Sequence, residues 1–230
     1  MPLKKATGNM YDFIDWIWNP ISGKCSHNCS YCYIPRIAAR FKLNQREPHI
    51  VEHEFRTNLK SGVFIFICDN CDLFAADIPD CWITRVVKRC RNYPGNRYLF
   101  QTKNPQRLVS SSFGLSAVSD VICTTLETNR WVPEIMRNAP LPQLRAMAMA
   151  MLADKGFKTM VTVEPVMDFD IDKMMRLIRM TKAVQVNIGA KTGGHSGFPE
   201  PPAEKIRELI SELNTFTRVV EKDNLRRLLV

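Results

Sequence analysis

The run from Gly62 to Cys68 constrains the fold most, because its side chains are apolar at consecutive positions. A strand that is apolar on both faces suits a parallel sheet covered by helices, not a sheet with one face in water. From Asp80 to Cys90, apolar residues then recur at spacings of three, four and seven, which predicts a helix. This pairing of a buried strand with a following helix indicates an α/β chain built from βαβ units.

The same alternation recurs along the chain. Six strand–helix units precede a last strand, and a polar cysteine-rich loop directly follows the first strand. We therefore expect a partial (β/α)6 TIM-like barrel with a parallel sheet; a doubly wound sheet is the alternative. The predicted strands are 12–19, 62–68, 97–102, 121–126, 158–163, 183–188 and 216–220, and the predicted helices are 34–43, 80–90, 105–109, 142–155, 171–178 and 202–213.

The length of the chain favours a single domain over 1–230. No shift in composition marks a second domain, and 230 residues are enough for a substantial core. We expect the core over about 12–215, with residues 1–10 as an untethered start. Residues 216–230 would add the last strand and a basic tail.

Composition limits the surroundings of the protein. Hydrophobic content of 45% and charged content of 24% are ordinary for a soluble globular protein. The longest wholly apolar run, Ala146 to Ala153, is far shorter than the ~20 residues that span a membrane. Lys4 and Lys5 are not followed by the apolar segment of a secretory signal. We expect a cytoplasmic monomer with no membrane contact.

The charge balance favours polyanionic partners. Lysine plus arginine total 32 against 23 acidic residues, a formal charge of +9. DNA or RNA is therefore an expected partner, and a merely solvated basic surface is the alternative. Basic residues gather after the cysteine-rich loop and at the C-terminal end: Arg36, Arg40, Lys42, Arg46, Arg218, Lys222, Arg226 and Arg227.

Cys25, Cys29 and Cys32 are the clearest chemical signal. Three thiols within eight residues can wrap around one face of an iron–sulfur cube. Such cubes are usually held by four cysteines, so three leave one iron open. Zinc, with His27 or a distant residue as the fourth ligand, is the alternative. A disulfide framework is not expected, because those belong mainly to small secreted proteins.

The predicted strands share a second property, which is that each apolar strand ends in polar residues. In parallel α/β folds the carboxyl ends of the strands meet at one face and form the active site. The polar ends are 19–32, 69–72, 102–104, 124–129, 164–165, and 187 with 189–197. We therefore expect one shared site that includes the three cysteines.

Several of these segments resemble one superfamily. The cysteine spacing, with Tyr31 before the last cysteine, is similar to the radical S-adenosylmethionine (SAM) pattern. Over roughly 16–190 the chain resembles a compact branch of that superfamily, which includes phage-associated proteins and proteins similar to spore photoproduct lyase. The residues that carry this resemblance are 18–20, 72–74, 101–103, 126–128 and 164–165.

The resemblance implies a cofactor set and a chemistry. A [4Fe–4S] cluster held by Cys25, Cys29 and Cys32 would pass an electron to SAM, and the resulting 5′-deoxyadenosyl radical would take a hydrogen atom from a substrate. An external reductant such as flavodoxin or ferredoxin would supply the electron. The resemblance also implies the SAM contacts: Tyr31 near the adenine, Asp69 and Asn70 at the amino group, Lys103 at the carboxylate, Thr125 or Glu127 at the ribose, and Glu164 lining the site. The segment 69–72 departs from the two glycines and a glutamate usual there.

Four further residues are candidates for contact with the substrate. Cys68 and Cys71 resemble a redox or metal pair, and we expect only Cys71 to face the site, where its thiol could donate a hydrogen atom. Asn187, Lys191 and His195 belong to the last polar strand end and would meet the substrate.

The prediction is a small radical SAM enzyme that abstracts hydrogen from a substrate, and nucleic acid is the first candidate for that substrate. The reaction class (lyase, transferase or oxidoreductase) is left open. Two alternatives stand beside it: a non-catalytic Fe–S or zinc module that binds nucleic acid, and a radical SAM enzyme acting on a protein or a small metabolite.

Overall fold

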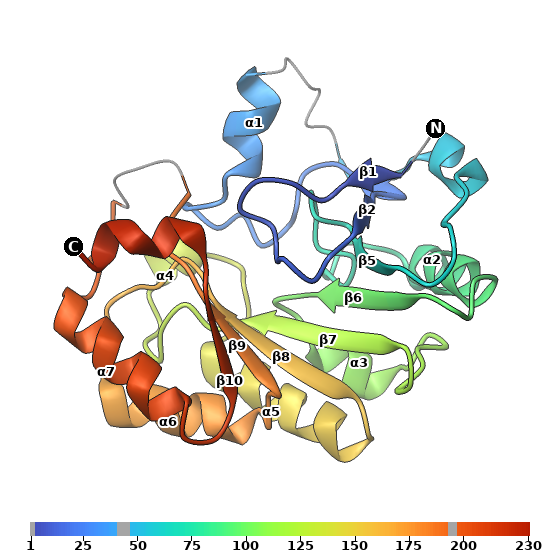
Figure 1. The fold of residues 1–230 in the computed structure, drawn as a ribbon. Helices are drawn as coiled ribbons and strands as arrows, with labels where there is room; N and C mark the ends of the chain where they lie inside the picture. Colours follow the sequence, from blue (N-terminus) through green and yellow to red (C-terminus); the bar gives the residue numbers. More distant parts are fainter. Residues whose placement is uncertain (1–2, 41–46, 193–196) are drawn as a thin grey trace.

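The computed structural model describes residues 3–40, 47–192 and 197–230. Its centre is a curved sheet in which seven strands run parallel and follow one another in chain order (Figure 1). From one edge to the other they are β2 (Trp16–Trp18), β5 (Phe64–Ile67), β6 (Arg97–Gln101), β7 (Asp120–Thr125), β8 (Lys158–Val163), β9 (Gln185–Ile188) and β10 (Arg218–Glu221). This is a partial (β/α)6 TIM-like barrel in a single domain, as predicted.

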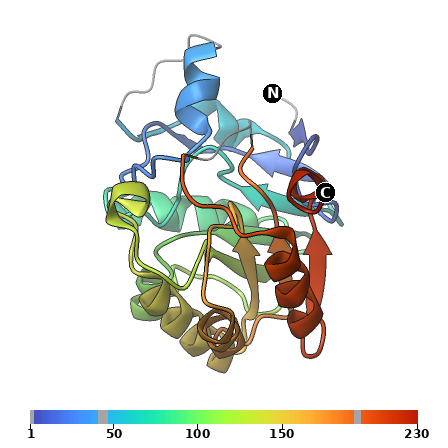
Figure 2. The ribbon, with the colours of Figure 1, turned by 90° about the vertical axis from the view of Figure 1, so that its left-hand side faces the viewer.

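Helices connect the strands and cover the outer face of the sheet. Consecutive helices α5, α6 and α7 pack against one another, and both views show them side by side (Figures 1 and 2). The helices are α1 (Ile34–Arg40), α2 (Asp80–Arg91), α3 (Gln106–Ser110), α4 (Pro133–Met136), α5 (Pro142–Asp154), α6 (Ile171–Met180) and α7 (Ala203–Leu213). Among the described residues, none of these helices is both long and apolar enough to cross a membrane.

Alternating side chains of the strands build two apolar layers. Ile65 and Ile67 of β5 join the cluster that packs under α2, whereas Phe64 and Phe66 join a second cluster with Leu99 and Val121. Both faces of the sheet are therefore buried, which is why these strands are apolar at consecutive positions. In α2 the predicted apolar stripe is buried at Ile83, Val86, Val87 and Cys90.

Both ends of the chain differ from the prediction. Residues 3–10 are not untethered, because β1 (Lys4–Lys5) pairs antiparallel with β2 and Leu3 is buried. The basic tail is also part of the core, since η2, a 3-10 helix over Asp223–Leu228, buries Leu225 completely. The first strand is shorter than predicted, and residues 41–43 of the first predicted helix lie outside the described residues.

Other small elements were not predicted either. A two-stranded sheet joins β3 (Ile21–Ser22) to β4 (His49–Ile50), and the 3-10 helix η1 (Glu52–Arg56) follows it. The third is α4, a single turn that packs beside the cysteine loop. Each is too short to have a periodic pattern of its own, so only long-range packing defines it.

Candidate active site

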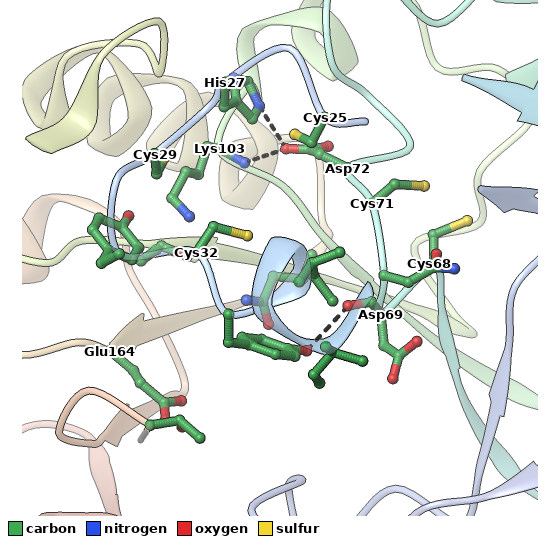
Figure 3. A pocket seen from close by; sticks show the side chains of 18 of the residues that line it. Cys25, His27, Cys29, Cys32, Cys68, Asp69, Cys71, Asp72, Lys103 and Glu164 are labelled. Carbon is green, nitrogen blue, oxygen red and sulfur yellow. Dashed lines mark hydrogen bonds and ion pairs between the residues drawn. The ribbon is translucent and has the colours of Figure 1, made fainter. Parts of the chain in front are cut away.

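A cavity of about 660 Å³ opens at the carboxyl ends of the parallel strands. The cysteine loop, residues 23–33, forms one wall, and the ends of β5 to β10 form the others (Figure 3). The strand ends therefore share one site, as the polar residues after each strand predicted. The lining residues that carry the chemistry are Cys25, His27, Cys29, Tyr31, Cys32, Cys68, Asp69, Asn70, Cys71, Asp72, Thr102, Lys103, Thr125, Glu164, Lys191 and Lys222.

The three cysteines of the loop all line this cavity as free, partly buried thiols. Two tight turns bring them there: the backbone N–H of Asn28 donates to Cys25 O, and that of Cys32 donates to Cys29 O, at 3.2 and 3.1 Å. Asn28 adopts a positive φ of 50°, which an asparagine tolerates better than most residues. The local sequence thus turns the loop so that three thiols reach one cavity.

Burial shapes the chemistry of these thiols. Burial, with the nearby Asp72 carboxylate, raises the pKa of Cys25 to about 12. Burial also raises the pKa of Cys32. Thiolates would form here only with a positive partner, and a metal centre that binds sulfur supplies one and releases the protons.

Three thiols around one cavity are a donor set that an iron–sulfur cube can use, because in such a cube each cysteine binds a different iron atom. Within 3–40, 47–192 and 197–230, no group of three His, Cys, Asp or Glu side chains is arranged to hold a single ion. Zinc, held by the three cysteines with His27 or a distant residue, stays the alternative.

Asp72 ties the end of β5 to the end of β6 and to the cysteine loop. Its Oδ2 accepts hydrogen bonds from the Thr102 hydroxyl and the Lys103 backbone N–H, at 3.0 and 2.8 Å, and lies 2.8 Å from His27 Nε2. Its Oδ1 accepts from the Phe74 N–H at 2.9 Å. Burial alone would raise the pKa of Asp72, but these bonds outweigh burial and lower it. Asp72 is therefore ionised, and His27 carries its proton on Nε2.

Glu127 lies behind the cavity wall and does not line the cavity. It is fully buried, accepts a hydrogen bond from the Tyr31 hydroxyl, and pairs with Arg145 at 2.7 Å. Burial would raise the pKa of Glu127, but Arg145 and Lys103 lower it to about 2. Of the two residues predicted to meet a ribose, Thr125 lines the cavity and Glu127 does not.

Lys103 lies beside the cysteine loop, near Cys29 and Cys32 (Figure 3). Its Nζ is 3.9 Å from Glu127 Oε1 and 5.1 Å from the centre of the Tyr31 ring. Burial alone would lower the pKa of Lys103, but the neighbouring Cys29 and Glu127 groups outweigh burial and raise it. The lysine is therefore a fixed positive charge beside the cysteines.

The end of β5 supplies an acceptor that has no donor. Asn19 and Asp69 exchange two hydrogen bonds, at 2.8 and 3.0 Å, which hold Asp69 at the cavity wall. The amide nitrogen of Asn70 donates to Ser22 Oγ at 3.2 Å, whereas Asn70 Oδ1 is buried with no hydrogen-bond partner among the described residues. A buried acceptor without a donor is costly, so this oxygen is suited to a ligand N–H group.

Cys68 and Cys71 both line the cavity, although only Cys71 was expected to do so. Cys68 is 3% exposed and adopts a positive φ of 59° at the end of β5. Cys71 Sγ donates to Ile21 O at 3.4 Å. A hydrogen bond with Cys68, together with burial, raises the pKa of Cys71, so it is a neutral thiol.

Glu164 joins three parts of the chain at the far side of the cavity (Figure 3). Its carboxylate accepts from Asn9 and Asn224, each at 2.8 Å, and pairs with Lys222 at 2.6 Å. Gly189 permits this arrangement, since a Cβ there would lie 2.9 Å from both Glu164 and Asn224. Glu164 lines the cavity, and three residues of the chain already occupy its carboxylate.

The predicted substrate residues have different positions. Lys191 lines the cavity. Asn187 does not, because it is fully buried and bonds to Gln185 and to Val161 O. His195 lies outside the described residues.

Sequence reasoning missed Asp72 and Arg145 as partners of the site. The signal for Arg145 was its position in a mostly apolar helix, because an arginine that is buried there needs an acceptor. Asp72 had no comparable signal, because the sequence of a polar strand end does not distinguish a residue that faces a ligand from one that binds another loop.

The comparisons with known proteins bear on the fold and on the family. A spore photoproduct lyase variant with bound AdoMet and dinucleoside spore photoproduct superposes with a TM-score of 0.66 at 10% identity, over 95% of this chain and 80% of that one. A second variant gives a TM-score of 0.65 at 11% identity, over 92% and 78%. At such identities the likeness shows the fold, and it agrees with the partial barrel. No curated protein matches the sequence. The family model described as "Protein of unknown function (DUF5131)" matches residues 9–204, so the chain belongs to that family.

Proposed function

We propose that this chain is a radical SAM enzyme. The observation that carries the proposal is the position of Cys25, Cys29 and Cys32, which line one cavity at the carboxyl ends of the barrel strands. Spore photoproduct lyase, which has been observed with AdoMet bound, shares the fold. When bound, a [4Fe–4S] cluster supplies an electron that cleaves SAM and starts hydrogen abstraction.

The residues of the cavity have suitable chemistry for SAM. Asp69 and the unpartnered Asn70 oxygen would accept hydrogen bonds from its amino group, and the Lys103 ammonium would pair with its carboxylate. Thr125 would meet the ribose hydroxyls, and the aromatic ring of Tyr31 would lie near the adenine. Glu164 would line the site with its carboxylate already neutralised by Lys222.

Cys71 is the proposed hydrogen donor to a substrate radical. It is a neutral thiol in the same cavity, so its S–H bond is available, and Cys25 lies close enough to influence its pKa. Donation would leave a sulfur radical on Cys71, which the external reductant and a proton would return to the thiol.

Nucleic acid is the proposed substrate, and charge supports it. Lys4 and Lys24 are exposed at the lining of the cavity in a chain whose formal charge is +9. Spore photoproduct lyase has been observed with a dinucleoside lesion in complex. A flavodoxin or ferredoxin is the proposed reductant.

Anaerobic reconstitution of the wild type and of Cys29→Ala tests the proposal. We expect the wild type to bind about four irons per chain, to absorb broadly in the visible, and to form 5′-deoxyadenosine from SAM with dithionite. Cys29→Ala should lose the iron and the SAM cleavage while its circular dichroism and melting temperature stay nearly unchanged, because its thiol lines the cavity and its hydrogen bond to Met136 O is long, at 3.7 Å.

Cys81→Ala is the matched control, since Cys81 is an exposed thiol on α2. It should behave like the wild type. SAM cleavage by Cys29→Ala at the wild-type rate would refute the proposal that this chain is a radical SAM enzyme. Iron uptake without any SAM cleavage would favour the non-catalytic module instead. If label passes from a protein or metabolite but not from nucleic acid into 5′-deoxyadenosine, the substrate class is wrong and the enzyme class stands.

A further inference from the structure

The cysteine loop is held at one point by a single side chain. His27 lies between Cys25 and Cys29, is only 5% exposed, and points away from solvent toward Asp72 (Figure 3). The side chains of His27 and Asp72 are 7% and 10% exposed, so water does not compete effectively for the hydrogen bond between them. No residue from Cys25 to Cys32 belongs to a helix or strand, so the loop depends on such contacts for its shape.

The partner of His27 is itself immobile. Asp72 accepts three other hydrogen bonds, two of them from backbone N–H groups of Phe74 and Lys103. These bonds join the ends of β5 and β6, which are hydrogen-bonded neighbours in the sheet. His27 therefore fastens the loop to the rigid part of the barrel.

The opposite side of the loop is held by backbone bonds to α4 and the residues after it. Ser30 N–H donates to Ile135 O at 2.9 Å, and Asn138 N–H donates to His27 O at 3.2 Å. The Asn138 amide also donates to Ser26 O at 2.9 Å. The loop is thus held from two sides. On the barrel side, His27 binds Asp72 next to Cys25 and Cys29, and Tyr31 binds Glu127 near the end of the loop.

We propose that His27 and Asp72 are positioning residues that hold Cys25 and Cys29 in the geometry that receives the cluster. That the loop receives an iron–sulfur cluster rests on the proposed function. That His27 and Asp72 hold the loop in place is a property of the chain alone. In metal sites, such outer partners commonly change metal retention about 10- to 100-fold when they are removed.

A role of His27 as a metal ligand is the competing explanation, because a ligating histidine often bonds a carboxylate through its other nitrogen. The two roles predict different results for His27→Gln. The amide nitrogen of glutamine can donate to Asp72 like the ring nitrogen, but glutamine does not replace a histidine ligand.

The first experiment uses the cluster-free protein and needs no activity. Iodoacetamide labelling, followed by mass spectrometry, measures the rate at each cysteine in wild type, His27→Ala, His27→Gln and Asp72→Asn. We expect Cys25 and Cys29 to react about 10- to 100-fold faster in His27→Ala and Asp72→Asn, the factor for a lost hydrogen bond to a charged group. His27→Gln should stay near the wild-type rate.

Cys90 is an internal control, since it is a residue of α2 that is fully buried in the core. It should label equally slowly in all four proteins. Unchanged rates at Cys25 and Cys29 in both loss variants, or an equal acceleration at Cys90, would overturn the proposal. If His27→Ala does not fold, the other two variants still test the proposal, because Asp72→Asn should label faster and His27→Gln should label at the wild-type rate.

The second experiment follows iron release to a chelator after anaerobic reconstitution. Release should be about 10- to 100-fold faster in His27→Ala, and His27→Gln should restore the wild-type rate. Failure of His27→Gln to restore retention, with normal labelling in the first experiment, would assign His27 as a ligand. A wild-type chain that takes up no cluster would refute the proposed function alone, because the labelling comparison still decides the role of His27.

Discussion

Glu127 and Arg145 form a fully buried ion pair behind the candidate active site. Both side chains are 0% exposed, and Arg145 also donates to the backbone oxygens of Thr125 and Pro140. The pair therefore has the hydrogen bonds that a buried charge requires. Through its bond with Tyr31 it also supports the end of the cysteine loop.

Replacing Glu127 with glutamine should lower the free energy of unfolding at pH 7 by about 3–5 kcal/mol, because it leaves Arg145 buried without its counter-charge. Urea unfolding measures this loss. Glu134→Gln, an exposed change on α4, is the control and should cost less than about 0.5 kcal/mol.

The same pair predicts a dependence on pH. The folded protein lowers the pKa of Glu127 from its ordinary value of 4.5 to about 2. Its stabilising contribution is therefore fully present above pH 4.5 and declines as the pH falls from 4.5 toward 2. The stability gap between wild type and Glu127→Gln should shrink over that window; a gap that stays constant down to pH 2 contradicts the buried pair.

At the scale of elements, the C-terminal segment is the main addition to what the pattern predicted. The strand β10 extends the sheet, and η2 places Asn224 and Lys222 on Glu164 while Leu225 enters the core. An arginine-rich sequence predicts a tail that is exposed to solvent. Here its charged residues Arg226 and Arg227 project outward from a helix turn that is anchored by one leucine.

Leu225→Ala should destabilise the fold by about 2–5 kcal/mol, as deletions of fully buried leucines do. It should also loosen the wall of the cavity that Lys222 and Asn224 form. Thermal or urea unfolding checks the first effect, and hydrogen exchange over 218–228 checks the second. Arg226→Ala, which removes an exposed side chain from the same turn, should have little effect; equal losses in both variants would mean that the tail is not docked.

At the scale of the whole molecule, charge is the property that bears on the substrate. Lysines lie at both ends of the barrel, so net charge alone does not locate a binding face. Lys4 and Lys24 are exposed beside the cavity, whereas Lys158 is exposed at the start of β8, at the amino ends of the strands. Lys42 and Arg46 lie outside the described residues.

If nucleic acid is the substrate, binding of a DNA or RNA oligonucleotide should weaken about tenfold or more between 50 and 200 mM salt. The double variant Lys4→Glu and Lys24→Glu should bind more weakly and show a smaller salt slope, by about one unit for each lost phosphate contact. Lys158→Glu makes a similar change at the opposite end and should bind like the wild type. Fluorescence anisotropy measures all three; equal weakening in both variants would mean a non-specific charge effect.

The fold was accessible from the sequence because its evidence is local. Gly62–Cys68 is apolar at consecutive positions since β5 is buried on both faces, and α2 repeats its apolar residues at the helical period. The cysteine spacing is equally local: two tight turns are enough to direct three thiols to one side. Short elements such as β1 and α4 were not accessible, because each exists only through pairing with a distant segment.

The sequence by itself determined the order of strands and helices, the end of the sheet that holds the site, and the three thiols. Only the tertiary structure decided which polar strand ends face the cavity. Asp72 and Glu127 look alike in the sequence, but Asp72 lines the wall and binds His27, 45 residues away, whereas Glu127 is buried against Arg145, 18 residues away. The physical reason is that a buried carboxylate must find its donors and counter-charge, and these come from segments whose proximity only the folded chain establishes.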